Sequence, residues 1–124
     1  MRILVVEDDT SLAGLMKALL ENWGHEAQHC TRGKDAERMF MASPYDLVLM
    51  EVLLPDMRGE DLISKLKGVS PDARIVTMTG NNSRDMEVRI RDRGILYYMV
   101  KPLETENLRS LLEHLSKRST GMQK

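Results

Sequence analysis

Five short apolar runs recur along the chain, and each is followed by a segment with helical periodicity. The runs span residues 2–6, 25–30, 46–50, 74–79 and 95–100. Runs of this length and composition are typical of strands in a sheet that is covered on both faces. Helices are expected over residues 12–23, 33–42, 59–68, 83–94 and 104–115. This alternation predicts a doubly wound α/β fold: a (βα)5 three-layer sandwich with a parallel five-stranded sheet between two layers of helices.

Bulk properties narrow the class of protein further. The 124 residues, 42% of them apolar, suffice for one domain with a single core. A net charge of −1 offers no basic face for nucleic acid, and no apolar run approaches the length of a membrane span. The single cysteine, Cys30, fits a reducing compartment. We therefore expect a cytoplasmic protein with one domain over residues 1–118, followed by a polar tail or the start of a linker at 119–124.

Ionisable and polar residues stand at the carboxyl ends of four predicted strands. They are Glu7, Asp8 and Asp9 after the first strand, Glu51 after the third, Thr79 and Gly80 at the fourth, and Lys101 and Pro102 after the fifth. In an open parallel sheet this edge is where ligands bind. Crowded carboxylates call for a cation among them, and oxygen ligands without His or Cys favour Mg²⁺. With the Lys101 charge and the Thr79 hydroxyl nearby, the edge suits a phosphoryl group. Asp9 can equally serve only as the N-cap of the first helix.

Four segments together resemble the receiver domain of two-component response regulators. ILVVEDD, DLVLMEVLLPDMRG, VTMTG and YYMVKP are similar to that family's first, third, fourth and fifth strands and the loops after them. The similarity runs from Arg2 to about Lys117. It implies a flavodoxin-like sheet with strand order 2-1-3-4-5. It also implies a signal-accepting module of a phosphorelay that is not itself an enzyme.

The resemblance assigns a role to each residue of the sheet edge. Glu7 and Asp8 correspond to Mg²⁺-binding acids, and Leu53 would offer the metal its backbone carbonyl. Thr79 corresponds to the switch hydroxyl, with Gly80 as the small residue beside it, and Tyr98 to the switch aromatic. Lys101 corresponds to the lysine that pairs with the phosphoryl group, and the peptide bond between Lys101 and Pro102 is expected to be cis.

The sequence departs from the family pattern at Glu51, which stands where the family has its phospho-accepting Asp. One extra methylene moves the carboxylate forward by roughly 1.5 Å, and a misplacement near 1 Å can cost on the order of a hundredfold in rate. We expect a poor phosphate acceptor with weakened Mg²⁺ binding, and at most a weak mimic of the phosphorylated state through contact with Lys101. Three explanations stay open: a natural receiver that has given up phosphorylation, an engineered Asp→Glu form, and a receiver that accepts phosphate slowly.

The same resemblance predicts the partners. A sensor histidine kinase or a phosphotransfer protein would supply the phosphoryl group, and the signal would leave through the fourth helix, fifth strand and fifth helix. Leu96 and Tyr97 are apolar where receivers often carry acids, which suggests a partner or homodimer contact there. The Arg-rich segment at 84–93 is balanced by acids and is expected to be a solvated face, with a specific docking surface as the alternative.

Other classes of protein are possible for this architecture. A flavin- or nucleotide-binding protein would need a Gly- or hydroxyl-rich loop after the first strand, where this chain has EDDTS. A Mg²⁺-dependent phosphatase or transferase would use Asp8 as its nucleophile. A phosphorylation-independent interaction module on a receiver scaffold is the remaining alternative.

Overall fold

The computed structural model describes residues 1–121, with side chains for residues 1–117, so positions 122–124 of the expected tail lie outside the described residues. Five strands alternate with five helices. Their bounds are β1 Arg2–Val6, α1 Thr10–Asn22, β2 Glu26–Cys30, α2 Gly33–Ala42, β3 Leu47–Glu51, α3 Gly59–Val69, β4 Ile75–Thr79, α4 Arg84–Arg91, β5 Tyr97–Val100 and α5 Thr105–Gly121. The predicted doubly wound α/β fold is confirmed.

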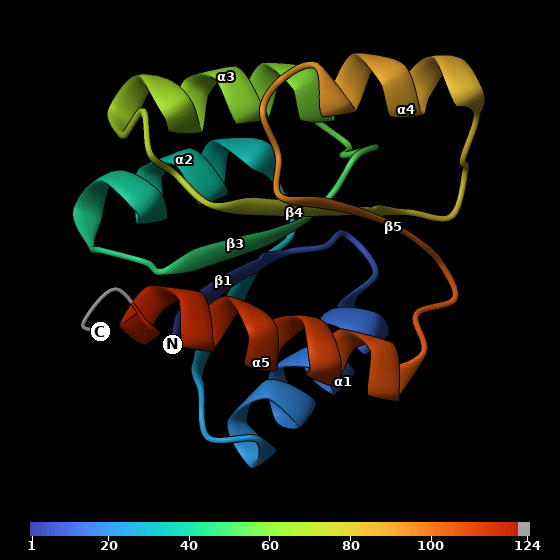
Figure 1. Cartoon of the computed structure of the whole chain (residues 1–124). Helices are drawn as coiled ribbons and strands as arrows, with labels where there is room; N and C mark the ends of the chain where they lie inside the picture. The colour runs from blue at the N-terminus through green and yellow to red at the C-terminus, as the bar shows by residue number, and fades with distance from the viewer. Residues whose placement is uncertain (122–124) are drawn as a thin grey trace.

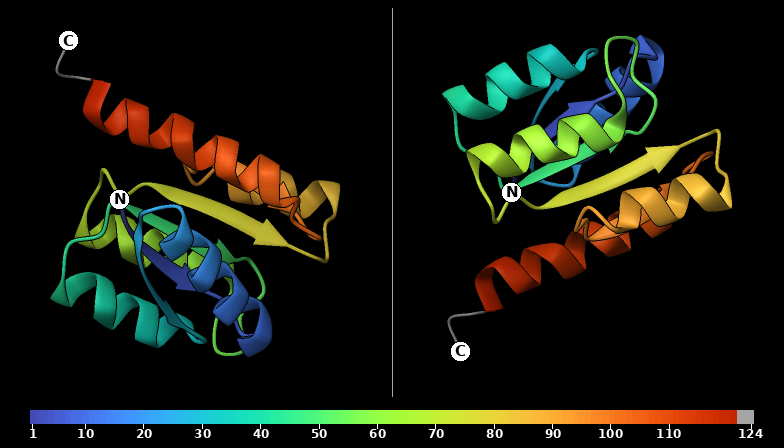
Figure 2. Two further views of the ribbon diagram at one scale, coloured as in Figure 1. Left: turned by 90° about the horizontal axis from the view of Figure 1, so that it is seen from below. Right: turned by 90° about the horizontal axis from the view of Figure 1, so that it is seen from above.

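The strands form one parallel sheet in the order β2-β1-β3-β4-β5, as predicted. Helices α1 and α5 cover one face, and α2, α3 and α4 cover the other (Figures 1 and 2). The inner strands β3 and β4 are buried along their whole length, whereas β2 and β5 expose residues at the two edges of the sheet. This difference explains why the apolar run was clear for β3 and weak for β2.

Side chains of successive strand residues enter two separate cores, one on each face. On β1, Ile3 and Val5 pack against residues of α1 and α5, while Leu4 and Val6 pack against residues of α2 and α3. The alternation follows from the two-residue period of a strand. Because the inner strands contribute to both cores, their carboxyl ends are fixed rigidly, and these ends carry the site.

Several predicted boundaries are wrong by a few residues, for identifiable reasons. Gly68 does not end the third helix, because its φ is not positive and it stays helical; α3 ends at Val69, before the extended Ser70 that precedes Pro71. α4 ends at Arg91 and not at residue 94, since Gly94 has φ 84°. β5 begins at Tyr97, two residues later than predicted.

The last helix is longer than predicted. α5 was expected to stop at residue 115, but it continues to Gly121. No proline or glycine interrupts residues 116–120, so the polar composition there was mistaken for the end of the helix. Across the described residues, none of the helices is both long and apolar enough to cross a membrane.

Candidate functional site

The candidate site lies at the carboxyl ends of the strands, where the strand order reverses between β1 and β3. Val6 of β1 pairs with Met50 of β3, so Glu7, the residue after β1, and Glu51, the last residue of β3, lie side by side. This is the place where open α/β sheets bind ligands. Thr79 ends β4, and Lys101 follows β5 with its N–H bonded to the Thr79 carbonyl at 2.8 Å. The structure therefore brings together the acids, the hydroxyl and the lysine that the sequence placed at this edge.

Lys101 joins the two buried acids of the site. Its Nζ lies 2.6 Å from Oε1 of Glu7 and 2.6 Å from Oε1 of Glu51. The second oxygens of both carboxylates bind backbone N–H groups, that of Glu7 at Asp9 (3.1 Å) and that of Glu51 at Leu53 (3.0 Å). Glu7 is 1% exposed and Glu51 is 5% exposed. Each carboxylate is thus held at both oxygens, as a buried charge must be.

Burial and ion pairing act in opposite directions on these groups. Burial raises the pKa of Glu7 by more than the bonds from Lys101 and the Asp9 N–H lower it. For Lys101, burial works against the charged form, but the hydrogen bonds to Glu51 and Glu7 prevail and its pKa is raised. Lys101 therefore stays a cation well above neutral pH, and it is the positive charge at the centre of the site.

A cavity of about 340 Å³ opens beside this ion pair. Its lining comprises Asp8, Glu51, Leu53, Thr79, Gly80, Asn81 and Lys101. Asp8 is exposed there, whereas the neighbouring Asp9 turns away and caps α1, its carboxylate accepting the Leu12 N–H at 3.1 Å. Of the two interpretations of Asp9, the capping role is the one that the structure shows.

The acids of the site match Mg²⁺ in chemical type, but two of them are already paired with Lys101. Glu7 and Glu51 share one ammonium, and Asp8 lines the cavity beside them, which leaves excess negative charge for a cation to neutralise. Among the side chains that the structure describes, those of residues 1–117, no three acidic, His or Cys groups are drawn together as they would be around a bound metal ion. Lys101 takes one oxygen from each of the two buried acids, so a metal ion would have to compete with it.

The peptide bond between Lys101 and Pro102 is cis. Gly80 lies beside the lysine: a Cβ added at Gly80 would be 3.8 Å from Cδ of Lys101, an ordinary contact. Gly80 lines the cavity, and an alanine at this position would not clash with the lysine.

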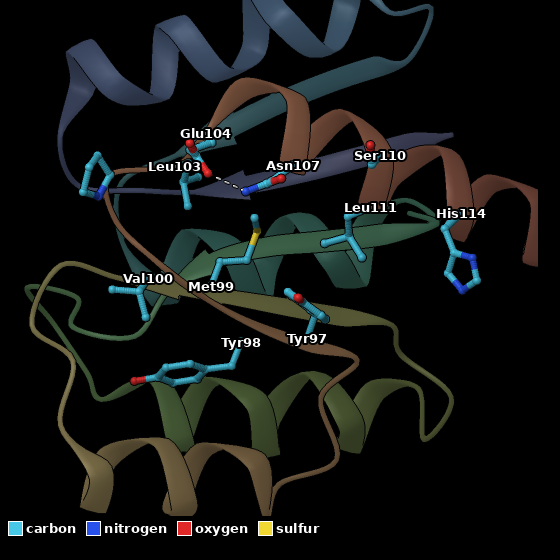
Figure 3. A pocket seen from close by; sticks show the side chains of 11 residues that line it. Tyr97, Tyr98, Met99, Val100, Leu103, Glu104, Asn107, Ser110, Leu111 and His114 are labelled. Atoms are coloured by element: carbon cyan, nitrogen blue, oxygen red, sulfur yellow. Dashed lines mark hydrogen bonds between the residues drawn. The ribbon is translucent and has the colours of Figure 1, made fainter.

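Tyr98 is buried on the side of β5 that faces α4 and is turned away from α5 (Figure 3). Its hydroxyl donates to Oδ1 of Asn82 at 2.8 Å, and the guanidinium of Arg91 lies 5.6 Å from its ring centre. Burial, with the nearby Glu87 charge, raises the pKa of the Tyr98 phenol. Asn82 was not singled out from the sequence. The asparagine pair before the predicted helix at Ser83 is typical of a turn, but it does not indicate a contact with Tyr98.

The loop between β3 and α3 is closed at its base and fixed at its tip. At the base, the Gly59 N–H donates to the Val52 carbonyl at 2.7 Å, and a Cβ on Gly59 would come within 2.8 Å of that oxygen. At the tip, the carboxylate of Asp56 accepts from the backbone N–H groups of Gly33 (2.8 Å) and Lys34 (3.0 Å), capping α2 from outside that helix. The segment from Glu51 to Leu53 is thereby held in place.

Comparison with known proteins agrees with this geometry. The model of the response regulator receiver domain matches residues 3–113. The chain belongs to the response regulator receiver family. Receiver domains are signalling modules of two-component systems and not enzymes, so the flavin-binding and phosphatase alternatives fall away.

Two relatives show how much of a longer protein such a domain represents. Transcriptional regulatory protein ZraR of Escherichia coli K12 is 33% identical over 111 residues, covering 90% of this chain and 25% of the relative. Regulatory protein VanRB of Enterococcus faecalis is 31% identical over 123 residues, covering 99% of this chain and 56% of the relative. The chain thus spans between about a quarter and a half of the length of these relatives.

Solved structures agree in fold. A CheY-like receiver domain protein from Methanospirillum hungatei JF-1 superposes with a TM-score of 0.89 at 27% identity, covering 97% of both chains. A response regulator from Burkholderia pseudomallei, solved with a phosphorylated aspartic acid and a calcium ion, gives a TM-score of 0.83 at 25% identity, covering 98% of this chain and 72% of the other.

Proposed function

We propose that this receiver domain carries Glu51 at its phospho-acceptor position and is therefore poorly phosphorylated, signalling instead through the ion pair of Glu51 with Lys101. The observation that supports this most is the 2.6 Å contact between Lys101 Nζ and Glu51 Oε1. In the receiver family, the lysine that corresponds to Lys101 pairs with the transferred phosphoryl group. Here the longer side chain of Glu51 already reaches it.

A glutamate can imitate only part of what a phosphoryl group does. Phosphorylation adds roughly −1.5 to −2 charge and three acceptor oxygens, whereas Glu in place of Asp adds reach and no charge. The bias that Glu51 gives the switch is therefore weak. The position of Thr79 is consistent with a weak bias. Its hydroxyl accepts the Asn81 N–H at 3.1 Å, so it is bonded within its own loop and not to Glu51 or Lys101.

Mg²⁺ is the cation that this site would take, held by Glu7, Asp8, Glu51 and the backbone carbonyl of Leu53. When bound, it would neutralise the excess negative charge of the acids. Its affinity is weakened here, because Lys101 occupies one oxygen each of Glu7 and Glu51.

A histidine kinase or a phosphotransfer protein in the cytoplasm is the partner that we propose for the same face.

Intact mass tests the acceptor assignment. The parent chain and Glu51→Asp are incubated side by side with Mg²⁺ and a small-molecule phosphodonor, and each is repeated with a chelator. We expect the aspartate variant alone to gain one phosphoryl group, and only when Mg²⁺ is present. If neither protein gains mass, the edge is no phosphate site, and an interaction module on a receiver scaffold becomes the better description.

A second proposal concerns the outer surface of β5 and α5, as a contact for another copy of this chain. A hollow of about 590 Å³ lies between these elements. Figure 3 shows its lining side chains, among them Tyr97, Leu111 and His114. Tyr97 and Val100 are 49% and 47% exposed on an edge strand, where bare apolar side chains favour association. One similar structure, the beryllofluoride-activated NtrC4 receiver domain (TM-score 0.86, 27% identity, 92% and 94% coverage), is a dimer.

Tyr97→Asp places a charge at the middle of that surface. If the parent chain dimerises there, light scattering will show a smaller mass for the variant at equal concentration. An unchanged mass would count against a dimer through β5 and α5.

A further inference from the structure

Asn82 is an exposed residue whose side-chain amide oxygen accepts a hydrogen bond from the hydroxyl of the buried Tyr98 at 2.8 Å. A tyrosine whose ring is buried needs a partner for its O–H, and here the amide oxygen of Asn82 accepts it. Tyr98 is only 5% exposed. The bond thus joins a core side chain of the edge strand β5 to a loop on the surface.

That loop is short and starts at the candidate site. It runs from Gly80 to Ser83, directly after Thr79, whose hydroxyl accepts the Asn81 N–H. It ends at the start of α4, where the Ser83 hydroxyl caps the helix by accepting the Met86 N–H at 3.1 Å. Asn82 is therefore fixed from both sides, by the bond at Thr79 before it and by the helix cap after it.

The far end of α4 touches the same tyrosine. Arg91, in the last turn of α4, places its guanidinium 5.6 Å from the ring centre. The ring thus lies under α4, bonded at the start of that helix and contacted at its end. Any displacement of the first turn of α4 would draw Asn82 away from the hydroxyl.

We propose that Asn82 is the positioning residue that ties the place of the Tyr98 ring to the loop after Thr79. A change at residue 51 reaches the tyrosine through this loop, and without the Asn82 bond the ring no longer follows it. The inference rests on the proposed switch role of Glu51 and goes beyond it, by naming the residue that transmits the change.

The chain offers a clean probe, because it has only three tyrosines, Tyr45, Tyr97 and Tyr98. Tyrosine labelled with carbon-13 in the ring gives few NMR signals, which are assigned by replacing one tyrosine at a time with Phe. Asn82→Ala removes the acceptor. Asn81→Ala is the matched control, because Asn81 uses its backbone N–H, which alanine keeps. Asn82→Asp keeps an oxygen at the acceptor position.

We expect the Tyr98 ring signals to move in Asn82→Ala and to stay in place in Asn81→Ala and Asn82→Asp, while Tyr45 serves as an internal reference. Adding Glu51→Gln, which removes the charge that pairs with Lys101, should shift the Tyr98 signals in the parent and in Asn81→Ala. The shift should be lost in Asn82→Ala.

Tyr98 signals that are the same in Asn82→Ala as in the parent would overturn the proposal. So would signals that move equally in Asn82→Asp, because the hydrogen bond would then not be the cause. If Glu51→Gln leaves Tyr98 unchanged in the parent, the switch role of Glu51 fails instead. The comparison of Asn82→Ala with Asn81→Ala still decides whether Asn82 holds the ring.

Discussion

Lys101 and Glu51 meet at 2.6 Å, although 50 residues separate them in the chain. The contact joins the ends of β3 and β5, which are not neighbours in the sheet, across the end of β4. It places a cation from the edge strand against an acid at the switch point of the fold. In this receiver domain the lysine is therefore already engaged before any phosphoryl group arrives.

Removing this lysine should destabilise the fold. Lys101→Met leaves Glu7 and Glu51 buried without their cation, and breaking a buried pair from one side costs about 3–5 kcal/mol. The Lys101 side chain keeps 19% of its surface in solvent, so we expect a loss in unfolding free energy at the lower end, about 3 kcal/mol. Urea denaturation measures it. Lys65→Met, an exposed lysine on α3, is the control, and an equal loss for both would show that the buried acids do not need Lys101.

A third buried acid, Glu60, is paired with an arginine. Glu60 in the first turn of α3 is 7% exposed and accepts from Arg89 Nε of α4 at 3.2 Å. Arg89→Met leaves that carboxylate buried and unpaired, which should cost about 1–3 kcal/mol in unfolding free energy. Replacing Glu60 by Leu in the same protein should recover most of the loss.

Arg38→Met supplies the comparison for this pair. Arg38 contacts Asp35 on the surface of α2, and exposed pairs contribute at most about 1 kcal/mol. The same denaturation experiment applies to both variants. Equal costs for Arg38→Met and Arg89→Met would mean that the Glu60 contact is no stronger than a surface pair.

Asp56 should make the free energy of unfolding depend on pH in the acidic range. Asp56 is exposed, and the little burial that it has opposes its charge, but the N–H groups of Lys34 and Gly33 prevail and hold the pKa of Asp56 below its ordinary value of 3.8. Because the folded pKa lies below the unfolded one, the stabilisation is complete above pH 3.8 and is lost as the pH falls through the folded value. Asp56→Ala should cost about 1 kcal/mol at neutral pH, as other helix caps do.

The difference between the parent and Asp56→Ala should then shrink as the pH is lowered below 3.8, in thermal or urea unfolding. Asp56→Asn keeps an acceptor oxygen without the charge and should lie between the two proteins at neutral pH. A difference that stays constant at all pH values would show that the ionised carboxylate is not what caps α2.

Much of this molecule could be predicted from particular residues. The runs around Val5, Leu49 and Val76 indicated strands that are covered on both faces, and parallel strands bring their carboxyl ends to one edge. Glu7, Glu51 and Lys101 were placed together by that rule alone. Element ends were less predictable, since Gly68 stays helical and the polar residues after Leu115 continue α5.

Contacts between loops and distant elements were out of reach of the sequence. Nothing in its pattern says that Asp56 caps a helix 22 residues earlier, or that Asn82 meets Tyr98. Such contacts depend on how the loops fold over the finished sheet, and residue type and spacing carry no information about that. For the same reason the sequence could not tell that Asp8 lines the cavity whereas Asp9 caps α1.

Backbone NMR should be recorded for the parent, for Glu51→Asp, and for Glu51→Asp phosphorylated in the presence of Mg²⁺. If the Glu51–Lys101 pair biases the switch without phosphate, the parent's amide signals from the β4–α4 loop and β5 will lie on the line joining the two states of the aspartate variant. They will be displaced a short way toward the phosphorylated end. Parent signals that coincide with those of unphosphorylated Glu51→Asp would show that the Glu51–Lys101 pair does not bias the switch.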